Sequence, residues 1–183
     1  MAKKLSSSIK PANKKNTPSL LMEPEVAYAT APTINYGSGI PSISSFLGKT
    51  KNASSDEGDI LNKHQYISII REGVKMQTLE HLMKTTDISS NEMASIMHTS
   101  ERTLRRYTPN TTLNPEQSER IIELARLFTR GSEVFGSLNN FKTWMNSTVV
   151  ALGNKKPKEL LDTSLGIEIL QEELGRIEHG IFA

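Results

Sequence analysis

Hydrophobic residues recur every three or four positions through most of residues 60–183, which is the period of amphipathic helices. The helices that this pattern predicts lie within residues 64–73, 75–86, 89–107 (two helices), 114–130, 137–145, 157–161 and 164–179. Residues 42–49 add three apolar positions at helical spacing, so we expect a short helix there, closed by Gly48. In residues 64–73 the period alone does not separate a strand from a helix, and we favour a helix ending at Gly73. The sequence therefore predicts an all-α fold.

The stretch 89–107 is predicted to form two short helices joined by a tight turn. Ser89 can cap the first helix, and Glu92 three residues later completes a capping box. The apolar pattern then breaks, and Thr99 or Ser100 can cap the second helix. Such a pair is the helix-turn-helix arrangement that enters the DNA major groove, although an ordinary helical hairpin has the same pattern.

Three arginines give the second helix of this pair a basic outer side. Leu104 and Tyr107 are three residues apart, share one face and are expected to pack inward. Arginine can bond two acceptors of guanine at once, and hydroxyl groups can bond phosphates. The candidate DNA-binding residues are Ser100, Arg102, Thr103, Arg105 and Arg106. His98 stands near the position where such a turn often carries glycine, and this departure favours the alternative of a solvated basic hairpin.

The later helices have recognisable start and stop signals. Asn114 followed by Pro115 predicts a helix start, and Gly131 is expected to end that helix near Arg130. The residues predicted to cap or open the following helices are Ser137, Pro157, and Thr163 or Ser164. In the last helix the predicted apolar stripe consists of Leu170, Leu174, Ile177 and Ile181.

Composition separates the N-terminal part of the chain from the rest. Hydrophobic residues make up 36% and aromatic residues 5% of the chain, which favours small helical domains over one large core. Residues 1–42 are rich in Ser, Thr, Pro, Asn and Lys and lack the apolar surface that offsets the entropy of ordering. Residues 1–60 are therefore expected to form a mostly disordered arm. Its lysines either add nonspecific attraction to phosphates or belong to a solvated tail that has no partner. Residues 154–183 carry four basic and six acidic groups, a net charge of −2, so the two ends suit different partners.

Several kinds of site are excluded or lack support. The chain has no cysteine, which excludes disulfides and thiol chemistry and fits a cytoplasmic protein. Its four histidines have no partner histidine at i+3 or i+4, so we expect no metal and no cofactor. No apolar run approaches the roughly 18–20 residues that span a bilayer, and no secretory signal is expected. An enzyme is disfavoured because no phosphate-binding loop and no nucleophile motif is present.

Short motifs occur in a fixed order through residues 132–183. They are Val134-Phe135-Gly136, Trp144-Met145-Asn146, Ala151-Leu152-Gly153, Pro157–Thr163, Gly166 and Arg176–Gly180. In this order they resemble the Xre/MbcA/ParS antitoxin family of type II toxin–antitoxin systems. The basic segment Arg102–Arg106 and the segment Leu113–Arg120 look like the Xre-type half that precedes this motif set, so the resemblance covers about residues 62–183.

The resemblance implies a domain organisation and a function. It implies an Xre-like helix-turn-helix domain at residues 61–130 and a toxin-binding helical domain at residues 131–183, after the arm of residues 1–60. Such proteins bind and neutralise a cognate toxin, usually a RES-domain enzyme that degrades NAD⁺, and the mechanism would be occlusion of its active site. They also tend to form homodimers and to repress their own operon by binding operator DNA.

Residues carried over from the family define a candidate toxin-binding surface. They are Trp144, Leu152, Pro157, Gly180, Ile181, Phe182 and Ala183. The spacing of Trp144 from Leu138 and Phe141 is equally that of a core helix, so a structural role for Trp144 stays open. Phe182 is the stronger expected contact because a chain terminus is usually loose unless something holds it. The alternative function is a helix-turn-helix transcriptional regulator whose C-terminal half only dimerises.

Overall fold

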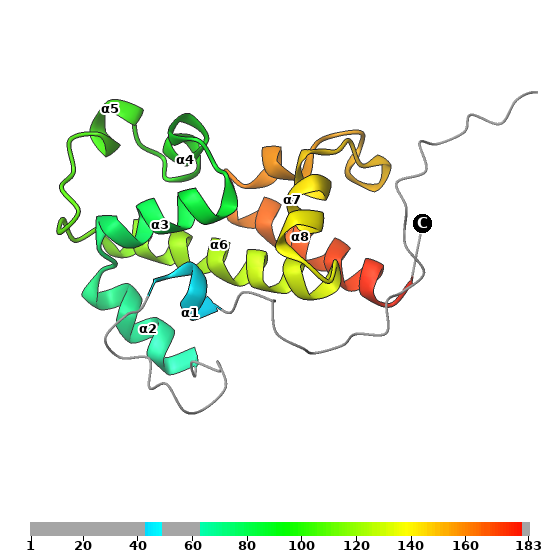
Figure 1. Ribbon diagram of the computed structural model, residues 1–183, viewed down its shortest axis with the longest axis horizontal. Coiled ribbons are helices and arrows are strands. Elements are labelled where there is room, and N and C mark those ends of the chain that lie inside the picture. The colour runs from blue at the N-terminus through cyan, green and yellow to red at the C-terminus, as the bar shows by residue number, and fades with distance from the viewer. Residues whose placement is uncertain (1–42, 49–62, 181–183) are drawn as a thin grey trace, which may run out of the picture. The chain divides into compact units, whose positions relative to one another are not determined.

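Helix α6 (Pro115–Val134) is the element on which most of the other helices pack in the computed structural model (Figure 1). The structure describes residues 43–48 and 63–180, which lie in one structural unit. The remaining helices are α1 (Ile43–Phe46), α2 (Lys63–Glu72), α3 (Met76–Thr86), α4 (Ser90–Ile96), α5 (Glu101–Leu104), α7 (Leu138–Asn146), the 3₁₀ turns η1 (Val150–Leu152) and η2 (Pro157–Leu160), and α8 (Ser164–Glu178). Within these described ranges there are two isolated bridges and no strand, which confirms the all-α prediction.

The predicted helix starts are confirmed by side-chain caps. In each case the cap oxygen accepts a hydrogen bond from a backbone N–H in the first turn, which satisfies one donor that the helix leaves free. The observed caps are Ser89 for α4, Ser100 for α5, Asn114 for α6, Ser137 for α7 and Thr163 for α8. The favoured helix over residues 64–73 is present as α2, which ends at Glu72, and Gly73 follows it with a φ of 87°.

The predicted end of α6 at Gly131 is wrong. The helix continues through Gly131 to Val134, and Gly136, with a φ of 71°, follows its C-cap. A Cβ built on Gly131 would lie 2.4 Å from ring atoms of Phe141. The glycine therefore serves close packing of α7 on α6, and the left-handed position that ends the helix comes five residues later.

Helix α1 confirms the predicted short helix at residues 42–49. Phe46 and Leu47 are 0% and 2% exposed, and the Phe46 ring lies 6.1 Å from that of Phe128 on α6. The imidazole of His81 lies 2.8 Å from the carbonyl oxygen of Ser45. The rest of the predicted arm, residues 1–42 and 49–62, lies outside the described residues.

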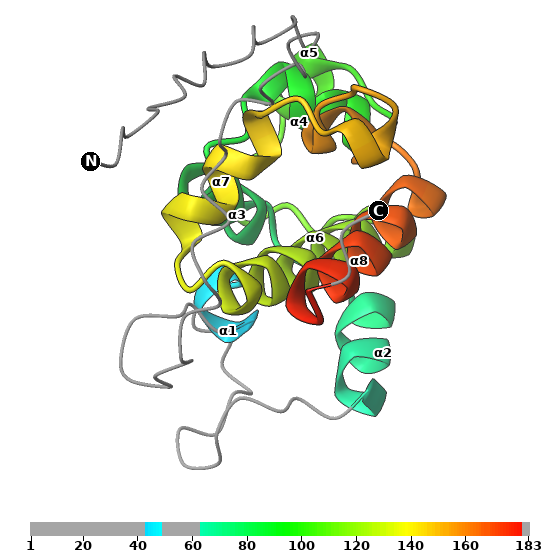
Figure 2. The same cartoon turned by 90° about the vertical axis from the view of Figure 1, so that its right-hand side faces the viewer.

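The last helix packs along α6 (Figure 2). Leu170 and Leu174 are fully buried and Ile177 is partly buried, as the stripe predicts, whereas Ile181 lies outside the described residues. Because α6 also contacts α1, α2, α3 and α7, a single helix joins the N-terminal and C-terminal groups of helices. No helix in the described ranges is long and apolar enough to cross a membrane.

Candidate functional site

The predicted pair of helices at residues 89–107 is present as α4 and α5. The Ser89 hydroxyl oxygen accepts from the Glu92 backbone N–H, and the Glu92 carboxylate accepts from the Ser89 backbone N–H at 2.9 Å. These two bonds form the expected capping box. The side-chain hydrogen bond from Ser89, with a further contribution from Lys158, lowers the pKa of Glu92 below its ordinary value.

The turn between these helices uses a histidine in a left-handed conformation. His98 has a φ of 50°, and its N–H donates to the Ser95 carbonyl oxygen at 3.1 Å. The next N–H, that of Thr99, donates to the Ala94 carbonyl oxygen at 2.9 Å. Non-glycine residues adopt this conformation uncommonly, but histidine is enriched there. The absence of glycine therefore does not prevent the tight turn.

Helix α5 is shorter than expected. It ends at Leu104, which is buried, and Arg105 is its C-cap. The N–H groups of Arg106 and Tyr107 donate to carbonyls three residues back, at 3.1 and 3.2 Å, so the chain tightens here instead of continuing the α-helix. Tyr107 therefore packs partly buried against the core from outside the helix on which we placed it.

The three predicted arginines are exposed together around α5. Arg102, Arg105 and Arg106 line one open hollow with Glu101. Arg105 pairs with Glu101 at 2.6 Å, and the Arg105 side chain is 73% exposed. Among the described residues no ion pair engages Arg102 or Arg106, which leaves their guanidinium groups available for phosphate or base contacts.

The hydroxyl groups of the candidate residues Ser100 and Thr103 already take part in the N-terminal cap of α5. Ser100 Oγ accepts from the Thr103 N–H at 3.0 Å and lies 2.8 Å from the Thr103 hydroxyl. A phosphate contact by either hydroxyl stays a prediction. In such a contact the hydroxyl group would bond the phosphate and the helix cap at the same time.

The predicted toxin-binding residue Trp144 lies in the core. It is 3% exposed, stacks on Phe141 with ring centroids 5.7 Å apart, and lies 5.4 Å from the Phe135 ring. Its indole N–H is buried and has no hydrogen-bond partner among the described residues. The side chain is therefore a packing residue in the free chain, and its expected contact with a partner stays a prediction.

The other carried-over residues are spread over the C-terminal helices. Leu152 is partly buried and packs on the core, and Pro157 is buried where it opens η2. Gly180 is exposed, with a φ of 65°, two residues after the end of α8. Residues 181–183, including the expected contact Phe182, lie outside the described residues.

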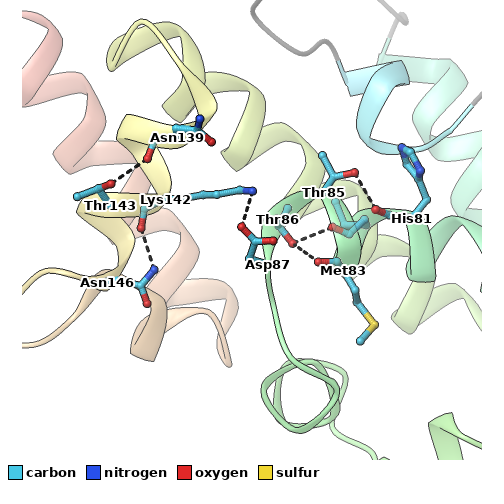
Figure 3. Close-up of polar contacts among 10 residues, drawn as sticks. His81, Met83, Thr85, Thr86, Asp87, Asn139, Lys142, Thr143 and Asn146 are labelled. Carbon is cyan, nitrogen blue, oxygen red and sulfur yellow. Dashed lines mark hydrogen bonds and ion pairs between the residues drawn. The ribbon is translucent and has the colours of Figure 1, made fainter.

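Two ion pairs that sequence reasoning missed connect the N-terminal and C-terminal helices. Lys142 on α7 donates to Asp87 beyond α3 at 2.6 Å (Figure 3), and Lys158 on η2 donates to Glu92 on α4 at 3.0 Å. They flank a cavity of about 280 Å³ whose lining includes the apolar side chains of Ile96, Phe128, Met145 and Leu161. No sequence signal identifies these pairs, because their members lie 55 and 66 residues apart.

A second hollow, near the end of α4, gathers acidic side chains. It has a volume of about 200 Å³, and its lining includes Glu116, Glu119, Glu123 and Arg120. Burial raises the pKa of Glu123, although Arg120, 2.9 Å away, opposes this. Within the described ranges no three His, Asp or Glu side chains are grouped so that they could hold a metal ion.

Two family models match consecutive parts of the chain, from α2 to the end of α8. One, described as the antitoxin Xre-like helix-turn-helix domain, matches residues 65–126, and it includes α4 and α5. The other, described as the antitoxin Xre/MbcA/ParS C-terminal toxin-binding domain, matches residues 130–180. The domain boundary that we expected, between residues 130 and 131, lies inside α6 and stays a prediction.

Curated proteins with similar sequences have antitoxin names. The chain is 29% identical over 119 residues to a protein named Antitoxin Xre from Yersinia enterocolitica, covering 64% of this chain and 80% of that protein. It is 26% identical over 137 residues to an Antitoxin Xre from Photorhabdus laumondii, covering 74% and 89%. It is also 26% identical over 127 residues to a protein named Prs ADP-ribosylating antitoxin from Sphingobium sp., covering 64% and 80%. With an Xre-like helix-turn-helix domain followed by a toxin-binding domain, this chain belongs to the Xre/MbcA/ParS family of antitoxins.

Proposed function

We propose that this chain neutralises a cognate RES-domain toxin that degrades NAD⁺, by binding over the toxin's active site. The observation that carries the proposal is the toxin-binding domain over residues 130–180. A toxin that consumes NAD⁺ is also consistent with the Sphingobium relative, whose name refers to ADP-ribosylation, since that reaction takes ADP-ribose from NAD⁺. The chain acts by binding in the cytoplasm, without a cofactor and without catalysis of its own.

The C-terminal tail is the part of the chain that we propose to enter the toxin's cleft. Helix α8 ends at Glu178, and Gly180 follows in the left-handed conformation that commonly ends helices. Residues Gly180–Ala183 then offer Phe182 as an aromatic anchor, the type of side chain that often dominates an interface. Trp144, Leu152 and Pro157 would support this surface from within the domain.

Growth of cells tests this proposal. The neighbouring gene is induced alone, then with the full-length chain, then with the chain lacking Gly180–Ala183. Toxicity that is relieved by the full-length chain and not by the truncated chain supports neutralisation through the tail. Relief by both would keep the antitoxin role and place the contact on the folded domain. A neighbouring gene that is not toxic, or toxicity that persists with the full-length chain, would contradict the proposal.

We also propose that the chain binds operator DNA as a homodimer and represses its own operon. The exposed arginine face around α5 supports this role, because it places three cations beside a capped helix pair. A dimer would present two such faces, which matches the two-fold symmetry of a palindromic operator. The same observation supports the alternative of a transcriptional regulator whose C-terminal half only dimerises, and the growth experiment separates the two.

A further inference from the structure

The outward face of α8 carries apolar side chains that the other described residues do not cover. Leu165 is 66% exposed and Ile169, one turn later, is 38% exposed. Residues four apart lie on the same side of a helix, so these two form one patch. The other large exposed hydrophobic residues in the described ranges, Ile67 and Val150, stand singly on other elements. Single exposed hydrophobic residues are ordinary, whereas contiguous apolar patches mark interaction sites, so this pair is the candidate among the described residues.

Gly175 on the same helix has no packing explanation among the residues that the structure describes. It lies inside α8, and a Cβ built on it would meet nothing within 4 Å. Glycine in a helix interior lowers helix stability relative to alanine, so a glycine that packing does not require destabilises the helix without a structural benefit. Gly131 and Gly166 differ, since a Cβ at either would collide with Phe141 or Leu160. The open space beside Gly175 allows a partner's atoms to approach the helix backbone closely.

Two carboxylates of this face have no ion-pair partner among the described residues, although the face also carries Arg176, four residues after Glu172. Glu168 and Glu172 are exposed, and helical spacing puts them between Gly175 and the apolar pair. No ion pair among the described residues engages either of them, whereas Glu173 pairs with Arg176 and Glu178 with Arg130. The two free carboxylates suit a basic rim on a partner.

We infer that the outward face of α8, formed by Leu165, Glu168, Ile169, Glu172 and Gly175, docks on the cognate toxin. The whole face lies within the matched toxin-binding domain, and it leads directly to the proposed tail contact. A second copy of the chain fits this face less well, because a two-fold interface would bring the unpaired carboxylates of both copies together. The inference rests on the proposed function and assigns a surface that Trp144 and Pro157, both buried, do not provide.

Binding of the purified full-length chain to the protein encoded by the neighbouring gene tests the inference. Leu165→Asp is compared with Val150→Asp, a matched control because both residues are 66% exposed. We expect Leu165→Asp to raise Kd about tenfold or more, as for loss of an interface anchor, and Val150→Asp to change it far less. Circular dichroism confirms that both variants fold.

Gly175→Ala provides a readout that a purely structural role would not give. We expect a higher melting temperature together with a severalfold weaker affinity, since the added methyl group favours the helix but obstructs the partner. Unchanged affinity in Leu165→Asp, or equal losses in Leu165→Asp and Val150→Asp, would overturn the inference. A change in oligomeric state of the Leu165→Asp chain alone, seen by sedimentation, would assign the face to a second copy and also overturn it.

The wild-type chain separates this inference from the proposed function. If the wild-type chain does not bind the neighbouring protein, the proposed function fails, and the inference fails with it. If the wild-type chain binds and the Leu165→Asp chain binds equally well, only the surface assignment fails.

Discussion

The Glu92 side chain makes both a local contact, with the helix cap Ser89, and a long-range contact, with Lys158. Its carboxylate accepts hydrogen bonds from the Ser89 N–H at 2.9 Å, the Ser89 hydroxyl at 2.6 Å and Lys158 Nζ at 3.0 Å. These bonds favour the ionised form and lower the pKa in the folded state. The stabilisation is therefore present above the ordinary value of 4.5 and is lost as the pH falls through the lowered value.

Replacement of Glu92 by Gln tests this pH dependence. We expect Glu92→Gln to lower the free energy of unfolding at neutral pH and to have less effect at a pH below the lowered pKa of Glu92, where the wild-type carboxylate is itself protonated. Urea unfolding at both pH values measures the difference. Glu80→Gln, at an exposed position on α3, is the control. A Glu92→Gln deficit that is equal at both pH values would contradict the assignment.

Two glycines in helices are predicted to respond oppositely to the same substitution. Gly131→Ala would push a methyl group into the Phe141 ring, 2.4 Å away, and should lower the free energy of unfolding by about 1–3 kcal/mol. Gly175→Ala meets open space and should raise it by about 0.5–1 kcal/mol, the gain in helix propensity. Denaturant unfolding of the two variants side by side measures both effects. Stabilisation by both substitutions would show that backbone propensity, and not packing, governs these positions, and destabilisation by Gly175→Ala would contradict the open space beside it.

At the scale of the element, the stability of α5 depends on the contacts at its two ends more than on its length. It has only four residues, and isolated helices of this size are unstable in water. The Ser100 cap and the burial of Leu104 hold it in place, which leaves the arginines on its outer side. This helix therefore acts as a fixed platform for side chains around it, including Arg105 and Arg106 beyond its last residue.

Arg105→Ala is predicted to weaken binding to DNA from upstream of the chain's own gene while leaving the fold intact. The Arg105–Glu101 pair is exposed, so its loss should cost no more than about 0.5 kcal/mol of stability. If Arg105 contacts a phosphate, its loss should reduce the steepness of the plot of log binding constant against log salt concentration by about 1. Gel-shift titrations at several salt concentrations measure affinity and slope.

Glu101→Gln is the matched control for Arg105→Ala. It breaks the same ion pair at 2.6 Å but keeps the arginine, so DNA affinity should hold or rise. Unchanged affinity in Arg105→Ala, or an equal loss in Glu101→Gln, would rule out a direct DNA contact by Arg105.

At the scale of the whole molecule, packing on α6 outweighs the ion pairs between the N-terminal and C-terminal helices. Asp87 is 72% exposed and the Lys158–Glu92 side chains are 36% and 40% exposed, so each pair should contribute about 1 kcal/mol or less. In contrast, α6 buries Leu124, Leu127 and Phe128 completely or nearly so. Truncation of a single such core side chain typically costs about 2–5 kcal/mol.

The double variant Lys142→Ala, Lys158→Ala is therefore predicted to unfold in one cooperative transition. Trp144 is the single tryptophan of the chain, so its fluorescence reports on the C-terminal helices, while far-ultraviolet circular dichroism reports on all helices. We expect the two signals to change together, as in the wild-type chain, with a loss of at most about 2 kcal/mol for both pairs. Separate transitions in the variant would show that the ion pairs, and not α6, couple the two groups of helices.

Most elements could be predicted because their signals are local. A cap such as Ser89 or Asn114 bonds a backbone N–H three residues away, so the relevant partner is visible in the sequence. The sequence places Leu165 and Ile169 off the buried stripe of α8, but it does not show whether another segment covers them. The end of α6 was missed because Gly131 has the same local signal whether it ends a helix or packs against a ring.

The sequence by itself determined the helices, their caps and the ordered motifs that identify the antitoxin family, because these depend on hydrogen bonds and periodicity within a few residues. Only the tertiary structure decided that Trp144 is a core residue, that Lys158 reaches Glu92, and that the other described residues leave one face of α8 uncovered. Each of these depends on which surfaces meet after the chain folds back on α6. A residue's type and spacing give its capacity to pack or to bind, but burial by distant segments decides which of the two occurs.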